Sequence, residues 1–281
     1  MQDAIVLKGV QKHYPDFTLK VDLRLPAGAM MGLIGENGAG KSTTMKLILC
    51  MMRPDAGSIQ VLGMNPSEQE QEIKQRIGFV MDENHFHPGL KPMEIGRMMQ
   101  GIYRRWDMRA FEKALREFDL PAKKAVQTFS RGMKMKLSIA VALSHQAELL
   151  LLDEPTSGLD PVARDEILEI LQTFMQDERH SILFSSHITS DLEKTADYIT
   201  FLHEGNVICS DEKDALLRRY GIIACSRAEL ETMDRDAVIG VRAHAFGAQA
   251  MVDRMRYTGR HTVEPVNLET MMLFYTRGRE Q

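Results

Sequence analysis

The residues best suited to chemistry form a glycine-rich segment at positions 35–42. This segment satisfies the pattern G-x-x-x-x-G-K-[S/T], in which backbone amides surround phosphate oxygens, the lysine reaches the β- and γ-phosphates and the hydroxyl ligates Mg²⁺. A dinucleotide-binding loop is the other glycine-rich alternative, but here the lysine follows the last glycine and G-x-G-x-x-G is absent. We therefore expect a nucleotide to be bound by Gly35, Glu36, Asn37, Gly38, Ala39, Gly40, Lys41, Ser42 and Thr43.

Two carboxylates that follow a short apolar run form the second chemical group. Asp153 and Glu154 come directly after the four leucines at positions 149–152. A nucleotide hydrolase needs an acid close to Mg²⁺ and a second group that orients or deprotonates the attacking water. Asp153 suits the metal and Glu154 suits the water. Without a phosphate loop in the same chain, an acidic pair at this place would more often be a solvated strand end.

The apolar pattern predicts the elements that position these groups. Residues 17–25 alternate between apolar and polar, which is typical of a half-buried antiparallel strand. Short, continuously apolar runs are typical of strands covered on both faces of a parallel sheet; they occupy residues 29–34, 77–81, 149–152 and 182–184. Helical stretches lie between them, so we expect an α/β fold with a parallel core sheet and an antiparallel β-subdomain.

Two further regions differ from this alternation. Residues 92–124 are expected to be helical almost throughout, within a helical insertion at about residues 84–145. After Ser210 we expect a small α/β appendage in which Asn267 caps the last helix. The expected domains are residues 1–209 and 210–281. Within the appendage the predicted elements are a helix at 211–220, a strand at 238–241 and a helix at 248–255.

Composition excludes several classes of protein. Charged residues make up 26% of the chain, and the net charge is −4. The basic residues form no cluster along the sequence, so we expect no nucleic acid partner. No stretch approaches the roughly 18 uninterrupted apolar residues of a membrane span. The three cysteines have no close spacing, so neither a disulfide framework nor a cysteine-rich zinc site is predicted, and a reducing cytoplasm is the natural compartment.

In order and type, the motifs over about residues 4–209 resemble those of the ATPase subunit of ATP-binding-cassette (ABC) transporters. The matching features are an adenine-stacking aromatic at Tyr14, the Walker A loop at 35–42, the Walker B strand at 149–154, the D-loop at 157–160 and the switch histidine His187. The resemblance implies that ATP and Mg²⁺ are the cofactors. It also implies catalytic roles for Glu154, His187 and Lys41, with Ser42 and Asp153 at the metal.

Two positions depart from the family pattern. The signature peptide, usually Leu-Ser-Gly-Gly-Gln, has Arg131 at its third position; Ser130 and Gly132 remain and are expected to bind nucleotide. Arg131 adds a cation near the nucleotide or is a plain surface side chain, and the sequence does not decide between these. Where the family has the Q-loop glutamine, this chain has Asp82 followed by Glu83. We expect Asp82 to reach the metal directly or through water.

These two departures, together with the segment Phe129–Leu137 and the short tail, resemble the bacterial exporter ATPases of the bacitracin and peptide efflux subfamily. The resemblance implies a separate integral-membrane permease as partner, a peripheral position on the cytoplasmic face of the membrane, and peptides, antibiotics or other amphipathic compounds as substrates. It also implies a homodimer or a heterodimer of related chains with ATP at the interface. The alternative is a soluble ABC ATPase that acts on nucleic acid or on a protein complex.

Overall fold

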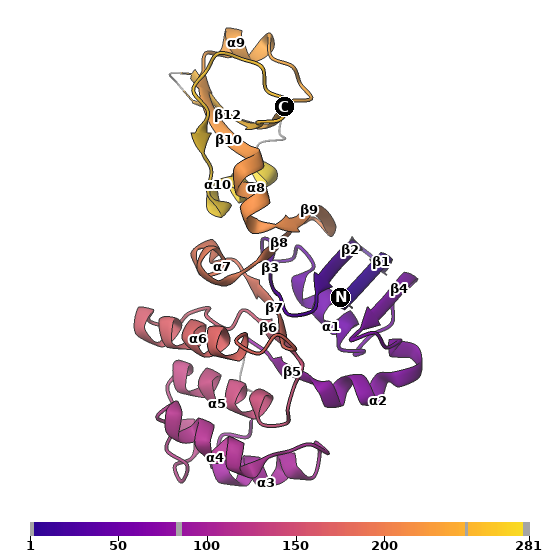
Figure 1. Cartoon of the computed structure of the whole chain (residues 1–281), viewed down its shortest axis with the longest axis vertical. Helices are drawn as coiled ribbons and strands as arrows, with labels where there is room; N and C mark the ends of the chain where they lie inside the picture. Colours follow the sequence, from indigo (N-terminus) through magenta and orange to yellow (C-terminus); the bar gives the residue numbers. More distant parts are fainter. Residues whose placement is uncertain (1–2, 83–85, 245–246, 278–281) are drawn as a thin grey trace.

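A nine-stranded mixed sheet forms the centre of the computed structural model, which describes residues 3–82, 86–244 and 247–277 (Figure 1). Glu83 lies outside these described residues. In spatial order the strands are β4 (Ala56–Val61), β1 (Asp3–Tyr14), β2 (Phe17–Pro26), β9 (Asn206–Glu212), β8 (Tyr198–His203), β3 (Met30–Ile34), β7 (Ser181–Ser186), β6 (Leu149–Asp153) and β5 (Ile77–Val80).

The strands predicted from continuous apolar runs are the parallel core of this sheet. β3 pairs in parallel with β7 and β8, and β6 pairs in parallel with β5 and β7. Their side chains are buried on both faces. Helices α5 (Arg131–Leu143), α6 (Pro161–Phe174) and α7 (Thr189–Thr195) share a core with one face, and α1 (Lys41–Ile48) and α2 (Pro66–Arg76) share a core with the other. Because both faces are covered, alternation with polar residues disappears from these strands.

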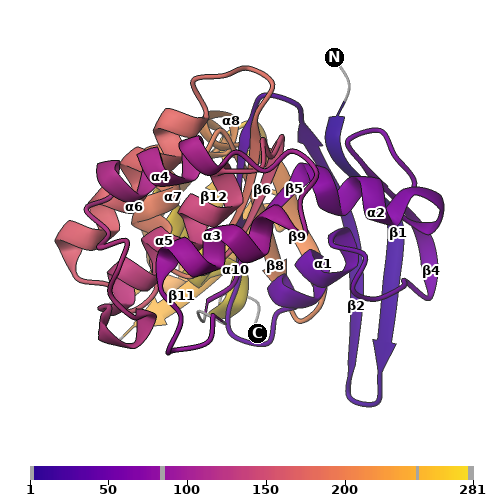
Figure 2. The ribbon, with the colours of Figure 1, turned by 90° about the horizontal axis from the view of Figure 1, so that it is seen from below.

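The alternating segment forms β2, which pairs antiparallel with β1, and β1 pairs antiparallel with β4. In Figure 2 these three strands extend beside the helical layers as the predicted antiparallel β-subdomain. Val21, Leu23 and Leu25 are buried, whereas the residues between them are exposed. The period of two therefore marks the face that packs on the core.

The helical region after β5 is interrupted. Helices α3 (Pro92–Gln100) and α4 (Met108–Glu117) are separated by turns, so the prediction of helix almost throughout residues 92–124 is wrong. Asp107 explains the break, because its carboxylate accepts hydrogen bonds from the amides of Arg109 and Ala110 and so caps the start of α4. A short 3₁₀ turn (Val126–Thr128) precedes α5, and a separate apolar cluster centred on Phe111 joins α3, α4 and α5.

A second sheet of four strands lies at the end of the molecule opposite α3 and α4 (Figure 1). Its spatial order is β11 (Val238–His244), β12 (Gly247–Asp253), β10 (Tyr220–Cys225) and β13 (Glu264–Pro265). The short helices α8 (Lys213–Arg219) and α9 (Arg227–Glu231) flank β10, and α10 (Leu268–Arg277) follows β13. The amide of Thr270 donates to Asn267, as expected of the helix cap.

One prediction in this region is wrong, because residues 248–255 do not form a helix. Residues 248–253 belong to the internal strand β12, which pairs antiparallel with β10 on one side and β11 on the other, and residues 254–255 lie in a turn. Ala250, Met251 and Val252 are all buried, so the strand lacks the alternation that would have identified it. The strand β9 runs across residues 209 and 210, and the division into domains there stays a prediction.

Candidate functional site

The phosphate-binding loop lies between the end of β3 and the start of α1, as the pattern requires. Gly38 has a φ of 86° and Gly40 a φ of 110°, values that L side chains rarely adopt. A methyl group on Gly35 would lie 2.5 Å from the carbonyl oxygen of Leu202. Glycine is therefore required at these positions by backbone conformation and by close packing, and the backbone amides are left free to approach an anion.

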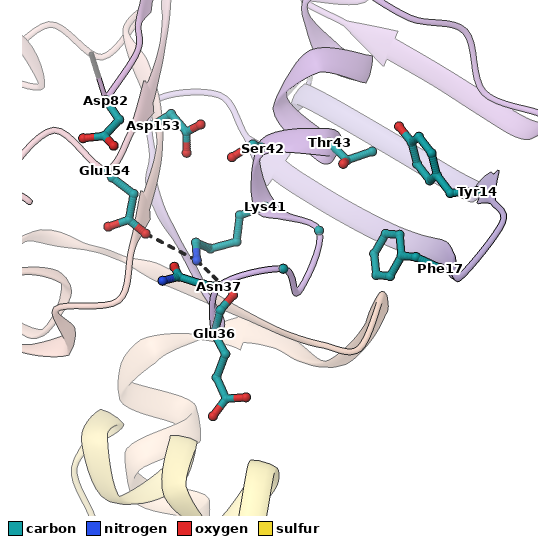
Figure 3. A pocket seen from close by; sticks show the side chains of 12 residues that line it. Tyr14, Phe17, Glu36, Asn37, Lys41, Ser42, Thr43, Asp82, Asp153 and Glu154 are labelled. Carbon is teal, nitrogen blue, oxygen red and sulfur yellow. Dashed lines mark hydrogen bonds and ion pairs between the residues drawn. The ribbon is translucent and has the colours of Figure 1, made fainter.

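Lys41, the first residue of α1, has a side chain only 6% exposed and lies within the loop. Its Nζ atom donates to the carbonyl oxygens of Gly35 at 2.7 Å and Glu36 at 3.2 Å. The same atom lies 3.3 Å from Oε1 of Glu154 (Figure 3). Because a buried ammonium group needs partners, these contacts hold the lysine at the place where the motif predicts phosphate.

Asp153 and Glu154 are positioned by the neighbouring strand β7. The Ser185 hydroxyl donates to Oδ1 of Asp153 at 2.6 Å, and its oxygen accepts from the amide of Glu154 at 3.0 Å. Ser185 is a site residue that the sequence motifs do not predict. In the sequence its signal is a serine directly after the apolar run 182–184 and two residues before His187. Its burial and its pairing opposite Asp153 are seen only in the structure.

Glu154 connects the loop to His187. Nδ1 of His187 lies 2.6 Å from Oε2 of Glu154, and the carboxylate is only 14% exposed. Oε1 of the same carboxylate faces Lys41. Among the described residues, no donor makes a hydrogen bond of suitable geometry to this oxygen. One oxygen thus faces the histidine and the other the lysine, which is an arrangement suited to holding a water molecule beside a bound phosphate.

A pocket of about 480 Å³ surrounds these groups (Figure 3). Tyr14 and Phe17 lie toward one end, beyond α1, and the carboxylates lie toward the other. The rings of Tyr14 and Phe17 are 6.1 Å apart, and Phe17 was not predicted from the sequence. The lining residues are Tyr14, Phe17, Glu36, Asn37, Gly38, Gly40, Lys41, Ser42, Thr43, Asp82, Asp153 and Glu154.

The same pocket contains groups that fit Mg²⁺. Ser42, Asp82 and Asp153 all line it, and carboxylate and hydroxyl oxygens are the ligands that this hard cation prefers. The Oδ1 atom of Asp153 is occupied by Ser185, which fixes the carboxylate in place. Asp82 is also paired with another side chain: Nη2 of Arg131 lies 2.8 Å from its Oδ1. The metal-binding role of Asp82 stays a prediction.

The signature residues lie apart from this pocket within the described chain. Ser130 is the N-cap of α5, and its hydroxyl oxygen accepts from the amide of Met133 at 3.2 Å. Gly132, in the first turn, leaves room for α6: a methyl group there would lie 2.9 Å from the Cβ atom of Ala163. Neither residue lines the pocket. The helix N-terminus is nevertheless exposed at Ser130, where backbone amides favour an anion.

Comparison with known proteins identifies relatives of this chain. Residues 19–157 match the family model described as "ABC transporter". The bacitracin transport ATP-binding protein BcrA of Enterococcus faecalis is 34% identical over 212 residues, covering 74% of this chain and 69% of its own length. The lantibiotic transport ATP-binding protein SrtF of Streptococcus pyogenes is 36% identical, with coverage of 74% and 90%.

Solved structures show the same fold. A protein described as the ATP-binding subunit of an ABC transporter is 27% identical, with a TM-score of 0.67 and coverage of 83% of this chain and 96% of its own. A dimeric ATP-binding cassette in a post-hydrolysis state with ADP and phosphate is 21% identical and has a TM-score of 0.66, which supports the fold alone. The α/β cassette fold is thus confirmed, and the chain belongs to the ATP-binding subunits of the ABC transporters.

Proposed function

We propose that this ABC ATPase powers a separate membrane-spanning exporter of peptides, antibiotics or other amphipathic compounds. The observation that supports ATP hydrolysis is the contact of Glu154 with both Lys41, in the phosphate pocket, and His187. The relatives named for transport of bacitracin and a lantibiotic support the exporter. In the described ranges, no helix combines the length and apolar character needed to cross a bilayer. In this proposal the transport path belongs to a permease subunit, and the chain works at the cytoplasmic face of the membrane.

The proposed chemistry is attack of water on the γ-phosphorus of ATP: a bond forms to the water oxygen, the bond from the γ-phosphorus to the oxygen shared with the β-phosphate breaks, and phosphate and ADP are released. Lys41 and the amides of the loop bind the phosphates, and Glu154 orients the water or accepts its proton. His187 holds Glu154 in position through the 2.6 Å contact. Ser42 and Asp153 would hold Mg²⁺, which would neutralise charge on the phosphates. Tyr14 stacks on the adenine, and Phe17 extends the aromatic end of the pocket.

We further propose a dimer with ATP at the interface. Ser130 and Gly132 lie outside the pocket of their own chain, yet the exposed N-terminus of α5 can bind an anion. The signature peptide of one subunit would then bind the γ-phosphate held by the other. A homodimer satisfies this arrangement, as does a heterodimer of two related chains.

The names of the relatives support the proposed substrate class. Two are named for transport of bacitracin and a lantibiotic, and a Bacillus subtilis relative at 32% identity is named for resistance to linearmycin. All three names refer to antibiotics. We therefore expect the exporter to protect cells against compounds of this kind.

The experiment combines purification with a resistance assay. The tagged chain is isolated from membranes of its own cells in detergent; the proposal predicts a copurifying protein with several apolar spans. Cells that carry the E154Q variant at equal expression should become sensitive to bacitracin or a lantibiotic. ATP-dependent binding to nucleic acid or a soluble complex, with no membrane partner and unchanged sensitivity, would instead support the soluble alternative.

A further inference from the structure

The two departures from the family pattern contact each other. Nη2 of Arg131 lies 2.8 Å from Oδ1 of Asp82, and the two side chains are 51% and 48% exposed. Asp82 follows β5 and lines the phosphate pocket, whereas Arg131 begins α5 directly after the cap residue Ser130. The ion pair therefore connects the pocket of this chain to its signature peptide.

Arg131 also lies against the loop that follows Glu154. A methyl group on Gly158 would come within 2.6 Å of Nη1 of Arg131, so the absence of a side chain there makes room for the guanidinium group. Gly158 has a φ of 66°, which favours glycine independently. Packing on Gly158 limits the directions available to the arginine and leaves Nη2 facing Asp82.

The carboxylates that line the pocket indicate what the ion pair between Arg131 and Asp82 does. Asp82, Asp153 and Glu154 all line a pocket that binds a polyanion, and an ionised carboxylate at position 82 repels phosphate. Lys41 lies close to Glu154, and Mg²⁺ is expected at Asp153, so each of these carboxylates has its own cation. Asp82 has Arg131.

We propose that Arg131 is a positioning residue that neutralises Asp82 and thereby allows ATP to bind beside a carboxylate. The inference deepens the proposed function and depends on ATP binding in this pocket. Two alternative roles of Asp82, metal ligand and partner of Arg131, make different predictions. As a metal ligand, Asp82 would be needed for Mg²⁺ affinity whatever occupies position 131. As the partner of Arg131, it becomes harmful to ATP binding once the arginine is lost.

The test uses R131M, D82N and the double variant D82N/R131M in the full chain. Binding of a fluorescent ATP analogue is titrated in excess Mg²⁺, and the Mg²⁺ dependence of ATP hydrolysis is measured separately. R131M leaves Asp82 without its cation, and we expect its dissociation constant to rise about two- to fivefold. D82N removes the repulsion, so the double variant should return to within about twofold of the original chain.

Two control variants distinguish the loss of affinity in R131M from a loss of folding. R131K keeps the charge and should restore most of the affinity lost in R131M. The exposed pair of Lys113 and Glu117 on α4 is 3.4 Å apart and is not part of the pocket lining, so K113M/E117Q should bind the analogue unchanged. Thermal unfolding of each variant reports whether the fold is intact.

The outcomes are distinct. Rescue of R131M by D82N, with an unchanged Mg²⁺ requirement in D82N, supports the inference. A double variant weaker than either single variant, or a Mg²⁺ requirement raised severalfold by D82N alone, overturns it in favour of metal binding. An original chain that binds no ATP analogue contradicts the proposed function itself, which is a different result from failed rescue.

Discussion

Glu154 contacts His187 through Oε2, with a distance of 2.6 Å to Nδ1, and faces Lys41 through Oε1 at 3.3 Å. Replacing it by glutamine keeps the shape but removes the charge and the group that can accept a proton from water. We expect E154Q to lower steady-state ATP hydrolysis by at least about a hundredfold. Binding of ATP should remain, because Lys41 and the loop amides are unchanged.

Phosphate release and equilibrium ATP binding, measured on the same preparation, check this prediction. The pocket of E154Q carries one negative charge fewer, so its ATP affinity should equal or exceed that of the original chain. Retained turnover in E154Q would contradict the assigned role. Loss of both binding and turnover would instead indicate a structural role for the carboxylate.

Tyr14 provides a second prediction at the other end of the pocket. Tyr14 is 40% exposed, its ring lies 6.1 Å from that of Phe17, and its hydroxyl donates to the sulfur atom of Met52 at 3.6 Å. If the ring stacks on adenine, Y14A should raise the KM for ATP about fivefold with little change in kcat. Y14F keeps the ring and should behave like the original chain.

Nucleotide preference supplies the complementary measurement for Tyr14. Loss of stacking should reduce the discrimination between ATP and a triphosphate with a smaller base, such as CTP. An equal loss in Y14A and Y14F would assign the effect to the hydroxyl and its contact with Met52. An unchanged KM in Y14A would remove Tyr14 from the site.

The sequence predicts the phosphate loop and the Walker B strand well because their residue types are fixed by local requirements. Gly40 adopts a φ of 110°, and Asp153 must end a buried strand, so both constraints are visible in the chain itself. Phe17 and Ser185 were missed because their roles depend on which strands become neighbours. Pairing of β6 with β7 places Ser185 opposite Asp153, and the β1–β2 hairpin places Phe17 beside Tyr14.

In the appendage, the sequence pattern predicts the wrong type of element. Residues 248–253 are apolar at spacings compatible with a helix, but they form a strand buried between β10 and β11. Tertiary pairing overrides a weak local preference in this case. The small size of the appendage, by contrast, predicts that it packs on the main body or on a partner. The ring of Tyr275 lies 5.5 Å from that of Phe201 on β8, so the last helix shares the core of the cassette.

A third prediction concerns the contact between helix α6, which follows the D-loop, and helix α7, which follows His187. Asp191 on α7 is 2% exposed, and its Oδ1 accepts from Nε of Arg164 on α6 at 2.6 Å. Removing one partner of such a pair leaves an uncompensated charge, so D191A should lower the free energy of unfolding by about 2–4 kcal/mol. Lys194 and Asp165 join the same two helices at 3.5 Å but are 64% and 62% exposed.

The exposed pair is the matched control for the buried one. D165A should change the free energy of unfolding by less than about 0.5 kcal/mol, because solvent screens the interaction. Urea denaturation of both variants under one set of conditions gives the comparison. Equal losses in D191A and D165A would show that burial does not strengthen the link between α6 and α7.

The fourth prediction concerns pH. Glu148 precedes β6, and Nε of Arg76, at the end of α2, donates to its Oε1 at 2.8 Å. The hydrogen bond from Arg76 holds the pKa of the Glu148 carboxyl below its usual value of 4.5. A lowered pKa in the folded state means that the ion pair stabilises the protein above about pH 4.5 and that this contribution is lost as the pH falls through the folded-state pKa.

E148Q should therefore be less stable than the original chain at pH 7, by about 1 kcal/mol, because the pair is partly exposed. The difference in free energy of unfolding between the two proteins should shrink steadily from pH 5 toward pH 3, since the carboxyl of the original chain becomes protonated and the two side chains become equivalent in charge. E117Q, which breaks the exposed contact with Lys113, should show a much smaller difference at either pH. A difference for E148Q that stays constant across this range would assign the stabilisation to packing of the side chain, because packing does not depend on its protonation.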